Sequence, residues 1–194
     1  MASELKTVCV YCGSSPGFKP EYRSAAYAFG AYLAGQGITT VYGGGNVGLM
    51  GAVADGALSA HGRVVGVIPR ALMDKELGHP ALAELIVVES MHERKLEMAR
   101  RADAFVALPG GIGTFEEIFE VLTWTQLGFH LKPCAFLNVE GFYTPLIAFL
   151  EQVAAQGFLR KEHLATVVVD TDMARLVTRL AAYEHVDYAK WRER

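Results

Sequence analysis

Residues 104–117, Ala-Phe-Val-Ala-Leu-Pro-Gly-Gly-Ile-Gly-Thr-Phe-Glu-Glu, contain the transition that decides the fold. The apolar run at 104–108 is typical of a buried strand, and the pattern over 115–127 is helical. Between them Gly110, Gly111 and Gly113 allow a sharp turn that brings backbone amides near a ligand. The free N–H groups and the positive dipole end of the helix would face the same point. We therefore expect a strand–loop–helix unit with an anion site at its turn.

The same alternation of short apolar runs and helix-length segments continues along the whole chain. Strands that are apolar on both faces and separated by helices indicate a parallel sheet covered on both sides. We predict an α/β fold, a doubly wound Rossmann-like parallel sheet of about seven strands with helices on both faces. No linker divides it, so residues 1–194 are expected to form a single domain with a peripheral tail from about residue 184. The predicted strands are Thr7–Tyr11, Thr39–Tyr42, Val64–Ile68, Leu85–Glu89, Ala104–Leu108, Cys134–Asn138 and Thr166–Val169, and the predicted helices are Glu21–Ala34, Gly48–Ala60, Met91–Ala102, Phe115–Leu127, Tyr143–Gln156 and Met173–Ala182.

The composition restricts the partners of the protein and its surroundings. Eighteen Lys and Arg against 21 Asp and Glu give a net charge of −3, which argues against nucleic-acid binding. The uncharged stretch at 24–54 is interrupted by glycines and predicts no membrane span. No signal-peptide pattern is visible at the N-terminus, and three cysteines, an odd number, suit a reducing cytoplasm. We expect a cytoplasmic protein.

Cys9 and Cys12 have the spacing of a redox pair. A redox pair normally lies at a helix N-terminus that stabilises the thiolate, whereas these cysteines lie in a strand-like run. Residues three apart on a strand also point to opposite faces. Buried structural thiols are the favoured interpretation, and a redox pair is the alternative.

A Gly/Ser-rich loop follows the first predicted strand. Gly13, Ser14 and Ser15 can donate N–H and O–H groups to an anion. The stretch 13–17 also matches the Gly-x-Ser-x-Gly elbow of hydrolases, although the proline after the serine fits that elbow poorly. A plain turn is the third interpretation.

Another glycine loop follows the second predicted strand, where Gly43-x-Gly45-x-x-Gly48 matches the dinucleotide fingerprint. That fingerprint requires an acidic residue about 20 positions on, and Ile-Pro-Arg stands there at 68–70. We therefore expect Gly43, Gly44, Gly45 and Gly48 to present backbone amides to a nucleotide. A purely structural turn is the alternative.

Two cations follow the fourth predicted strand. Ser90-x-x-Glu93 is a capping box, which places Arg94 and Lys95 in or just after the first helical turn. The helix dipole disfavours cations there, and a local rule broken at the carboxyl end of a strand indicates function. Solvated charges paired with Glu97 or other neighbours are the alternative.

Thr114-x-x-Glu117 also matches a capping box, so Glu117 is either a cap or a catalytic carboxylate, and both roles are compatible. The chain has no Gly-Lys dipeptide, which disfavours a Walker loop and Mg²⁺-dependent ATP chemistry. Its six histidines show no metal-ligand spacing. No metal site and no cofactor are predicted.

Taken together, these residues resemble the LONELY GUY (LOG) family of cytokinin-activating phosphoribohydrolases. The resemblance covers nearly the whole chain and centres on Pro-Gly-Gly-x-Gly-Thr-x-x-Glu at 109–117 and Met-x-x-Arg-Lys at 91–95. Tyr-Gly-Gly-Gly-x-x-Gly-Leu-Met-Gly at 42–51 and Cys-Gly-Ser-Ser at 12–15 are also similar to the family. An old "lysine decarboxylase" label that some members carry finds no support in these residues.

The resemblance implies hydrolysis of the N-glycosidic bond of an adenosine 5′-monophosphate, N6-prenylated or plain, to the free base and ribose 5-phosphate. It implies no metal or redox cofactor, and a homodimer. The motif match places the catalytic pair on Arg94 and Glu117. The implied substrate contacts are Glu76, Arg94, Lys95, Gly111, Ile112, Gly113, Thr114, Phe115, Glu116, Glu117 and Thr123, with Gly110 in the adjoining loop.

Two other functions stay open. A nucleotide-like cofactor carrier on the same fold, similar to molybdenum cofactor carrier proteins, would bind without turnover, and the intact Arg94 and Glu117 argue against it. An NAD(P)-dependent oxidoreductase built on the loop at 43–48 would lack its ribose-binding acid. The sequence does not decide between AMP and a prenylated substrate, or between salvage and hormone production.

Overall fold

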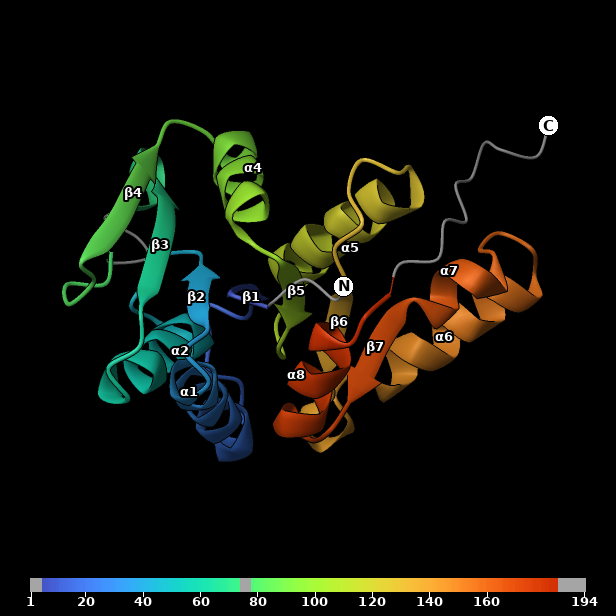
Figure 1. Cartoon of the computed structure of the whole chain (residues 1–194), viewed down its shortest axis with the longest axis horizontal. Helices are drawn as coiled ribbons and strands as arrows, with labels where there is room; N and C mark the ends of the chain where they lie inside the picture. The colour runs from blue at the N-terminus through green and yellow to red at the C-terminus, as the bar shows by residue number, and fades with distance from the viewer. Residues whose placement is uncertain (1–4, 74–77, 185–194) are drawn as a thin grey trace.

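The computed structural model describes residues 5–73 and 78–184, and these form one sheet of seven parallel strands (Figure 1). The order across the sheet is β4-β3-β2-β1-β5-β6-β7, which confirms the predicted α/β class. The strands are β1 (Thr7–Tyr11), β2 (Thr39–Tyr42), β3 (Val64–Pro69), β4 (Glu84–Val88), β5 (Ala104–Ala107), β6 (Cys134–Leu137) and β7 (Val167–Asp170). The helices are α1 (Pro20–Gly35), α2 (Gly48–Ser59), α4 (Met91–Arg101), α5 (Ile112–Gln126), α6 (Thr144–Ala155), α7 (Lys161–Ala165) and α8 (Met173–Ala181), with short 3₁₀ turns η1 (Arg70–Leu72) and η2 (Val139–Gly141).

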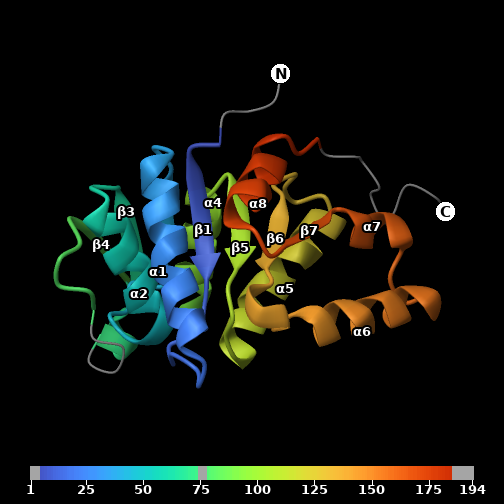
Figure 2. The same cartoon turned by 90° about the horizontal axis from the view of Figure 1, so that it is seen from below.

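Helices cover both faces of the sheet. Figures 1 and 2 show α1, α2 and α8 on one face and α4 and α5 on the other. The strands alternate side chains between two apolar clusters, so Val8 and Val10 join the first face while Cys9 and Tyr11 join the second. In the described part of the chain no helix is long and apolar enough to cross a membrane.

Part of the glycine content belongs to this scaffold. A Cβ on Gly30 of α1 would overlap the carbonyl of Val53 in α2, and a Cβ on Gly56 would overlap the carbonyl of Tyr27. The absence of both side chains lets the two helix backbones come into direct contact. The uncharged stretch at 24–54 therefore comprises most of α1, the strand β2 and the first half of α2. The two helices pack directly against each other.

The chain winds outward from β1 to β4 on one side and then crosses to β5 and outward to β7 on the other. The loops that follow β1 and β5 consequently diverge at the centre of the carboxyl edge. Ligands of open α/β sheets bind at such a switch point. The topology therefore indicates a ligand site at the loops 12–19 and 108–111.

The start of α5 differs from the prediction. The helix begins at Ile112 with Gly111 as its N-cap, three residues before the predicted start, and Thr114 lies inside the first turn. Glycine is an accepted N-cap residue, and the buried Thr114 side chain packs against Gly110 instead of capping. The capping-box interpretation of Glu117 is therefore wrong, because Glu117 is the sixth residue of the helix.

Candidate active site

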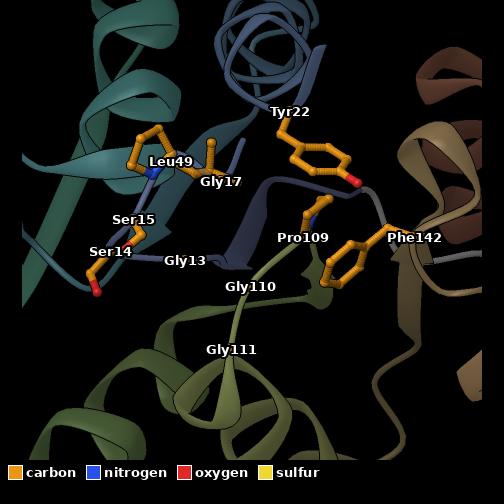
Figure 3. A pocket seen from close by; sticks show the side chains of 11 residues that line it. Gly13, Ser14, Ser15, Gly17, Tyr22, Leu49, Pro109, Gly110, Gly111 and Phe142 are labelled. Atoms are coloured by element: carbon orange, nitrogen blue, oxygen red, sulfur yellow. The ribbon is translucent and has the colours of Figure 1, made fainter. Parts of the chain in front are cut away.

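Two neighbouring cavities open at the switch point, with Gly13, Ser14 and Gly111 in the walls of both. The first, of about 250 Å³, lies between the loops after β1 and β5 and carries no charged side chain among its described lining residues. Figure 3 shows the rings of Tyr22 and Phe142 next to each other at one end of it. Their centroids are 5.7 Å apart in an edge-to-face arrangement.

The second cavity, of about 310 Å³, extends from the shared wall to α4 and α5 and contains the charged groups. Arg94 enters from α4, and Glu116 and Glu117 enter from α5. The structure therefore brings both residues of the expected catalytic pair to one cavity. The remaining wall consists of Cys12, Gly13, Ser14, Met50, Leu72, Met91, Gly111, Ile112, Gly113 and Thr114.

Arg94 is almost completely buried, with 5% of its surface exposed. The predicted capping box sets the start of α4, since Ser90 Oγ accepts from the Glu93 N–H at 3.1 Å. Arg94 Nη2 then reaches across to donate to the carbonyl oxygen of Gly43 at 2.8 Å. A side chain at Gly43 would occupy the space of this guanidinium. The interpretation of Arg94 as a solvated charge is therefore wrong.

Glu117 lies one and a half turns into α5 and is partly buried. Burial raises the pKa of the neighbouring Cys12 thiol far above its ordinary value, and the Glu117 carboxylate raises it further while Arg94 lowers it. The charges of Arg94 and Glu117 thus act on the same buried thiol. Cys12 is protonated at neutral pH and offers no thiolate for nucleophilic or redox chemistry.

Lys95 does not line either cavity. Its Nζ donates to Glu116 Oε1 and, at 3.0 Å, to Glu120 Oε1, and 7% of the residue is exposed. Burial alone would lower the pKa of Lys95, but these hydrogen bonds outweigh it and raise the pKa above its ordinary value. The alternative of a solvated Lys95 is wrong, because the residue is buried, but its pairing with neighbouring carboxylates holds: the partners are Glu116 and Glu120, whereas Glu97 pairs with Arg101.

The glycines of the loop before α5 have different surroundings. A Cβ on Gly110 would meet Thr114 and the Gly13 amide, so this glycine is required for packing between the two loops. A Cβ on Gly111 or Gly113 would meet nothing within 4 Å. These two positions leave space for a ligand at the N-terminus of α5, where the first N–H groups have no intrahelical acceptor.

The loop at 43–48 does not line the cavities. Gly43 supplies the carbonyl that holds Arg94, and the Gly44 carbonyl accepts from the His79 N–H at 3.0 Å. Gly45 forms a bridge with Gly78, and Gly48, at φ +57°, packs on the Ser14 backbone. The loop is therefore a support for Arg94 and for the wall of the site.

Two further expected substrate contacts, Phe115 and Thr123, do not line the cavities. The Phe115 ring packs against Tyr143, 6.3 Å between centroids, so its side chain faces the core. Thr123 is exposed, donates to the Phe119 carbonyl at 2.7 Å and lies roughly 9 Å farther along α5 than Glu117. Glu76 lies outside the described residues.

Other sequence matches find no support in the geometry. Cys9 in β1 and Cys12 directly after it are free buried thiols that join the apolar clusters on opposite faces of the sheet, which favours structural thiols over a redox pair. Ser15 lies in an exposed loop, and α1 begins only at Pro20, so the strand–turn–helix of a nucleophile elbow is missing. Among the described residues no group of three or more His, Cys, Asp and Glu is placed to hold a metal ion.

Several residues of the cavity walls and their surroundings carry no sequence signal. Tyr22 and Phe142 are far apart in the chain, and no short pattern connects them. Leu72 follows β3 in a segment without a motif. Met91, another residue of the same wall, does belong to the matched segment at 91–95. Glu120, the second partner of Lys95, lies one turn beyond the motif that contains Glu116.

Comparison with known proteins adds independent evidence. The family model described as "Possible lysine decarboxylase" matches residues 50–180. A protein of Oryza sativa subsp. japonica, named a probable cytokinin riboside 5′-monophosphate phosphoribohydrolase, is 49% identical over 181 residues, covering 93% of this chain and 80% of that protein. A cytokinin riboside 5′-monophosphate phosphoribohydrolase of Arabidopsis thaliana is 46% identical over 182 residues, covering 94% and 84%.

Solved structures share the fold. The molybdenum cofactor carrier protein of Chlamydomonas reinhardtii gives a TM-score of 0.71 at 22% identity, covering 93% of this chain and 100% of that one. This likeness concerns the fold alone, whereas the family model and the plant relatives extend over the site residues at 91–95 and 109–117. The chain belongs to the LONELY GUY family of cytokinin riboside 5′-monophosphate phosphoribohydrolases, whose model is described as possible lysine decarboxylase.

Proposed function

We propose that this protein hydrolyses the N-glycosidic bond of adenosine 5′-monophosphates, N6-prenylated or plain, and releases the free base and ribose 5-phosphate. The observation that carries the proposal is the convergence of Arg94 and Glu117 on one cavity beside the N-terminus of α5. The plant relatives are named for this reaction on cytokinin riboside monophosphates. A small-molecule nucleotide is therefore the substrate.

The residues suit the charges that develop during the reaction. Cleavage at C1′ builds positive charge on the ribose ring, as in glycoside hydrolysis. The Glu117 carboxylate stabilises that charge or activates the attacking water. The departing purine gains negative charge, which the Arg94 guanidinium offsets. Because Gly43 and the walls of the cavity hold Arg94 in place, its charge needs little reorganisation during the reaction.

The phosphate has a natural place at the N-terminus of α5. The open positions of Gly111 and Gly113 let an oxyanion approach the first N–H groups of the helix. Binding at a group remote from the reacting bond orients the ribose and contributes to the rate. A volume of about 310 Å³ is at the lower end of the range for small-ligand sites. The neighbouring cavity therefore offers further space for the nucleotide.

The test is release of base from AMP and from isopentenyladenosine monophosphate by the wild-type protein, with the corresponding nucleosides as phosphate-free controls. We expect Glu117→Gln and Arg94→Ala each to lower the rate by about 10²–10⁴-fold, with circular dichroism and melting curves showing that the fold survives. Near-wild-type turnover in folded Glu117→Gln would refute the catalytic assignment. Tight binding of AMP by the wild type without base release would instead identify a carrier.

We also propose that the protein is a homodimer. Leu96 of α4 and Phe129 after α5 are exposed, and with Trp124 they line an apolar groove of about 400 Å³. A second copy of this chain would remove that apolar surface from water. Light scattering after gel filtration tests the state, and Phe129→Glu is expected to give monomers. A monomeric wild type would refute this part of the proposal.

A further inference from the structure

An ion cluster around a buried lysine joins the two helices that carry the expected catalytic pair. Lys95 of α4 donates from Nζ to the carboxylates of Glu116 and Glu120 of α5. The Lys95 side chain is 8% exposed, against 50% for Glu116 and 26% for Glu120. The cation is therefore enclosed between the helices, while its two partners approach it from the solvent side.

The cluster stands next in sequence to both groups of the active site. Arg94 and Lys95 are separated by about 100° around α4, so that Arg94 points to the end of the sheet while Lys95 points to α5. Glu116 and Glu117 are also about 100° apart on α5, and both line the second cavity, while the Glu116 carboxylate in addition accepts from Lys95. Each end of the ion cluster thus adjoins one member of the pair that faces the cavity.

The positive charge of Lys95 and the negative charges of Glu116 and Glu120 stabilise one another. Glu116 and Glu120 are four residues apart on α5, where like charges destabilise a helix. Lys95 between them neutralises part of that repulsion. Lys95 is the buried charge of the three, and leaving it without its carboxylates is costly, so the cluster favours the helix arrangement in which all three meet.

We propose that Lys95 is a positioning residue which, through Glu116 and Glu120, fixes α4 against α5 and thereby the separation of Arg94 and Glu117. In this role Lys95 acts through its two carboxylate partners, and it is absent from the described walls of both cavities. This inference rests on the proposed hydrolase function. It also assigns a role to Glu120, which no motif includes.

The experiment compares kcat and KM for AMP in the wild type, Lys95→Gln, Glu120→Gln, the double variant Lys95→Gln/Glu120→Gln and the exchanged pair Lys95→Glu/Glu120→Lys. A misplacement of about 1 Å costs roughly 10²-fold, so Lys95→Gln is expected to lower kcat by about 10- to 100-fold with KM within about twofold. Glu120→Gln lowers kcat less, because Glu116 remains as a partner. The double variant is no slower than Lys95→Gln alone, since both changes remove the same contact.

The exchanged pair provides the decisive readout, because it restores an attraction between α4 and α5 while removing a lysine at position 95. We expect it to recover at least tenfold in kcat over Lys95→Gln. The proposal is overturned if Lys95→Gln raises KM with kcat unchanged while Glu120→Gln behaves as wild type. It is equally overturned if the effects of the two single variants multiply and the exchanged pair recovers nothing.

Arg101→Gln is the matched control. Arg101 is on the same helix and also bridges two carboxylates, Glu97 at 2.6 Å and Glu84 at 2.9 Å, but it lies away from both cavities. We expect its kcat and KM to equal those of the wild type. Absence of base release by the wild type would refute the proposed function itself, whereas an active wild type with the contrary pattern above refutes only the role of Lys95.

Discussion

Replacing Gly43 by alanine perturbs the active site through a residue that touches neither cavity. Gly43 does not have a positive φ, so the backbone accepts alanine there. The added methyl would overlap Nη2 of Arg94 and would lie 2.9 Å from its Cζ and 3.0 Å from Sδ of Met50. The substitution therefore acts on the position of the guanidinium.

The size of the effect follows from this geometry. Cζ must retreat from 2.9 Å to the 3.4 Å of ordinary contact, and Nη2 must move farther, which weakens the 2.8 Å hydrogen bond to the Gly43 carbonyl. A displacement of about 1 Å of a catalytic group costs roughly 10²-fold in rate. That factor corresponds to about 2.7 kcal/mol of lost transition-state stabilisation. We expect kcat/KM for AMP to fall by about this factor.

The assay is base release at several AMP concentrations, with denaturant unfolding of each variant to measure stability. Crowding at position 43 is expected to cost about 1–3 kcal/mol of stability, which leaves the protein folded. Gly35→Ala is the matched control, because Gly35 ends α1 with nothing within 4 Å of its added Cβ. It is expected to keep full activity and to gain about 0.4–1 kcal/mol.

A Gly43→Ala protein with kcat/KM within threefold of the wild type would refute the reasoning. It would mean either that the guanidinium of Arg94 has another position that supports the same rate or that Arg94 does not act in the chemical step. A crystal structure of the variant separates these outcomes, because the first requires a displaced side chain. An unfolded Gly43→Ala protein would contradict the expectation that the backbone tolerates alanine.

The remaining predictions concern stability and the thiols. Gly30→Ala is expected to lower the free energy of unfolding by about 1–3 kcal/mol, because the methyl would overlap the facing helix backbone. An unchanged denaturation midpoint would contradict the close packing of α1 and α2. Hydrogen bonds from Arg175 hold the pKa of Asp170 well below its usual range, despite burial that would raise it. This carboxylate therefore stabilises the fold above the unfolded pKa of about 3.9, and its contribution is lost as the pH falls toward the depressed folded value. Asp170→Asn should unfold more easily than the wild type near neutral pH and equally easily in strong acid, whereas a pH-independent difference would exclude the ion pair as the cause. Burial raises the pKa of all three thiols, that of Cys134 to about 12, so an aromatic disulfide reagent should react only after unfolding; fast reaction of the native protein would contradict their burial.

Local patterns accounted for most element boundaries. Runs that are apolar on both faces located strands such as β1 and β2 to the residue, because burial on both faces leaves a continuous apolar signal. The helical pattern predicts the start of α5 three residues too late, because the glycines on either side of Ile112 have low helix propensity and hide the first turn. The pattern also could not distinguish a cap from a catalytic carboxylate at Glu117.

The two motifs of the candidate site likewise predicted some of its features and left others undecided. The motif at 109–117 predicted a glycine loop at a helix start, and the structure places that loop at the switch point. The motif at 91–95 predicted that its cations have a function but not how they differ. Arg94 faces the cavity, whereas Lys95 faces α5, and only the orientation of α4 in the fold separates these two neighbours.

By itself the sequence determined the α/β class and the glycine loops at strand ends, because both are expressed in the periodicity or spacing of nearby residues. The catalytic candidates followed from the resemblance of two motifs to the family. The tertiary structure alone decided that Gly43 holds Arg94, 51 residues away, and that Lys95 meets Glu120, 25 residues away. These pairings depend on how strands and helices pack. A contact across the fold leaves no periodic trace along the chain.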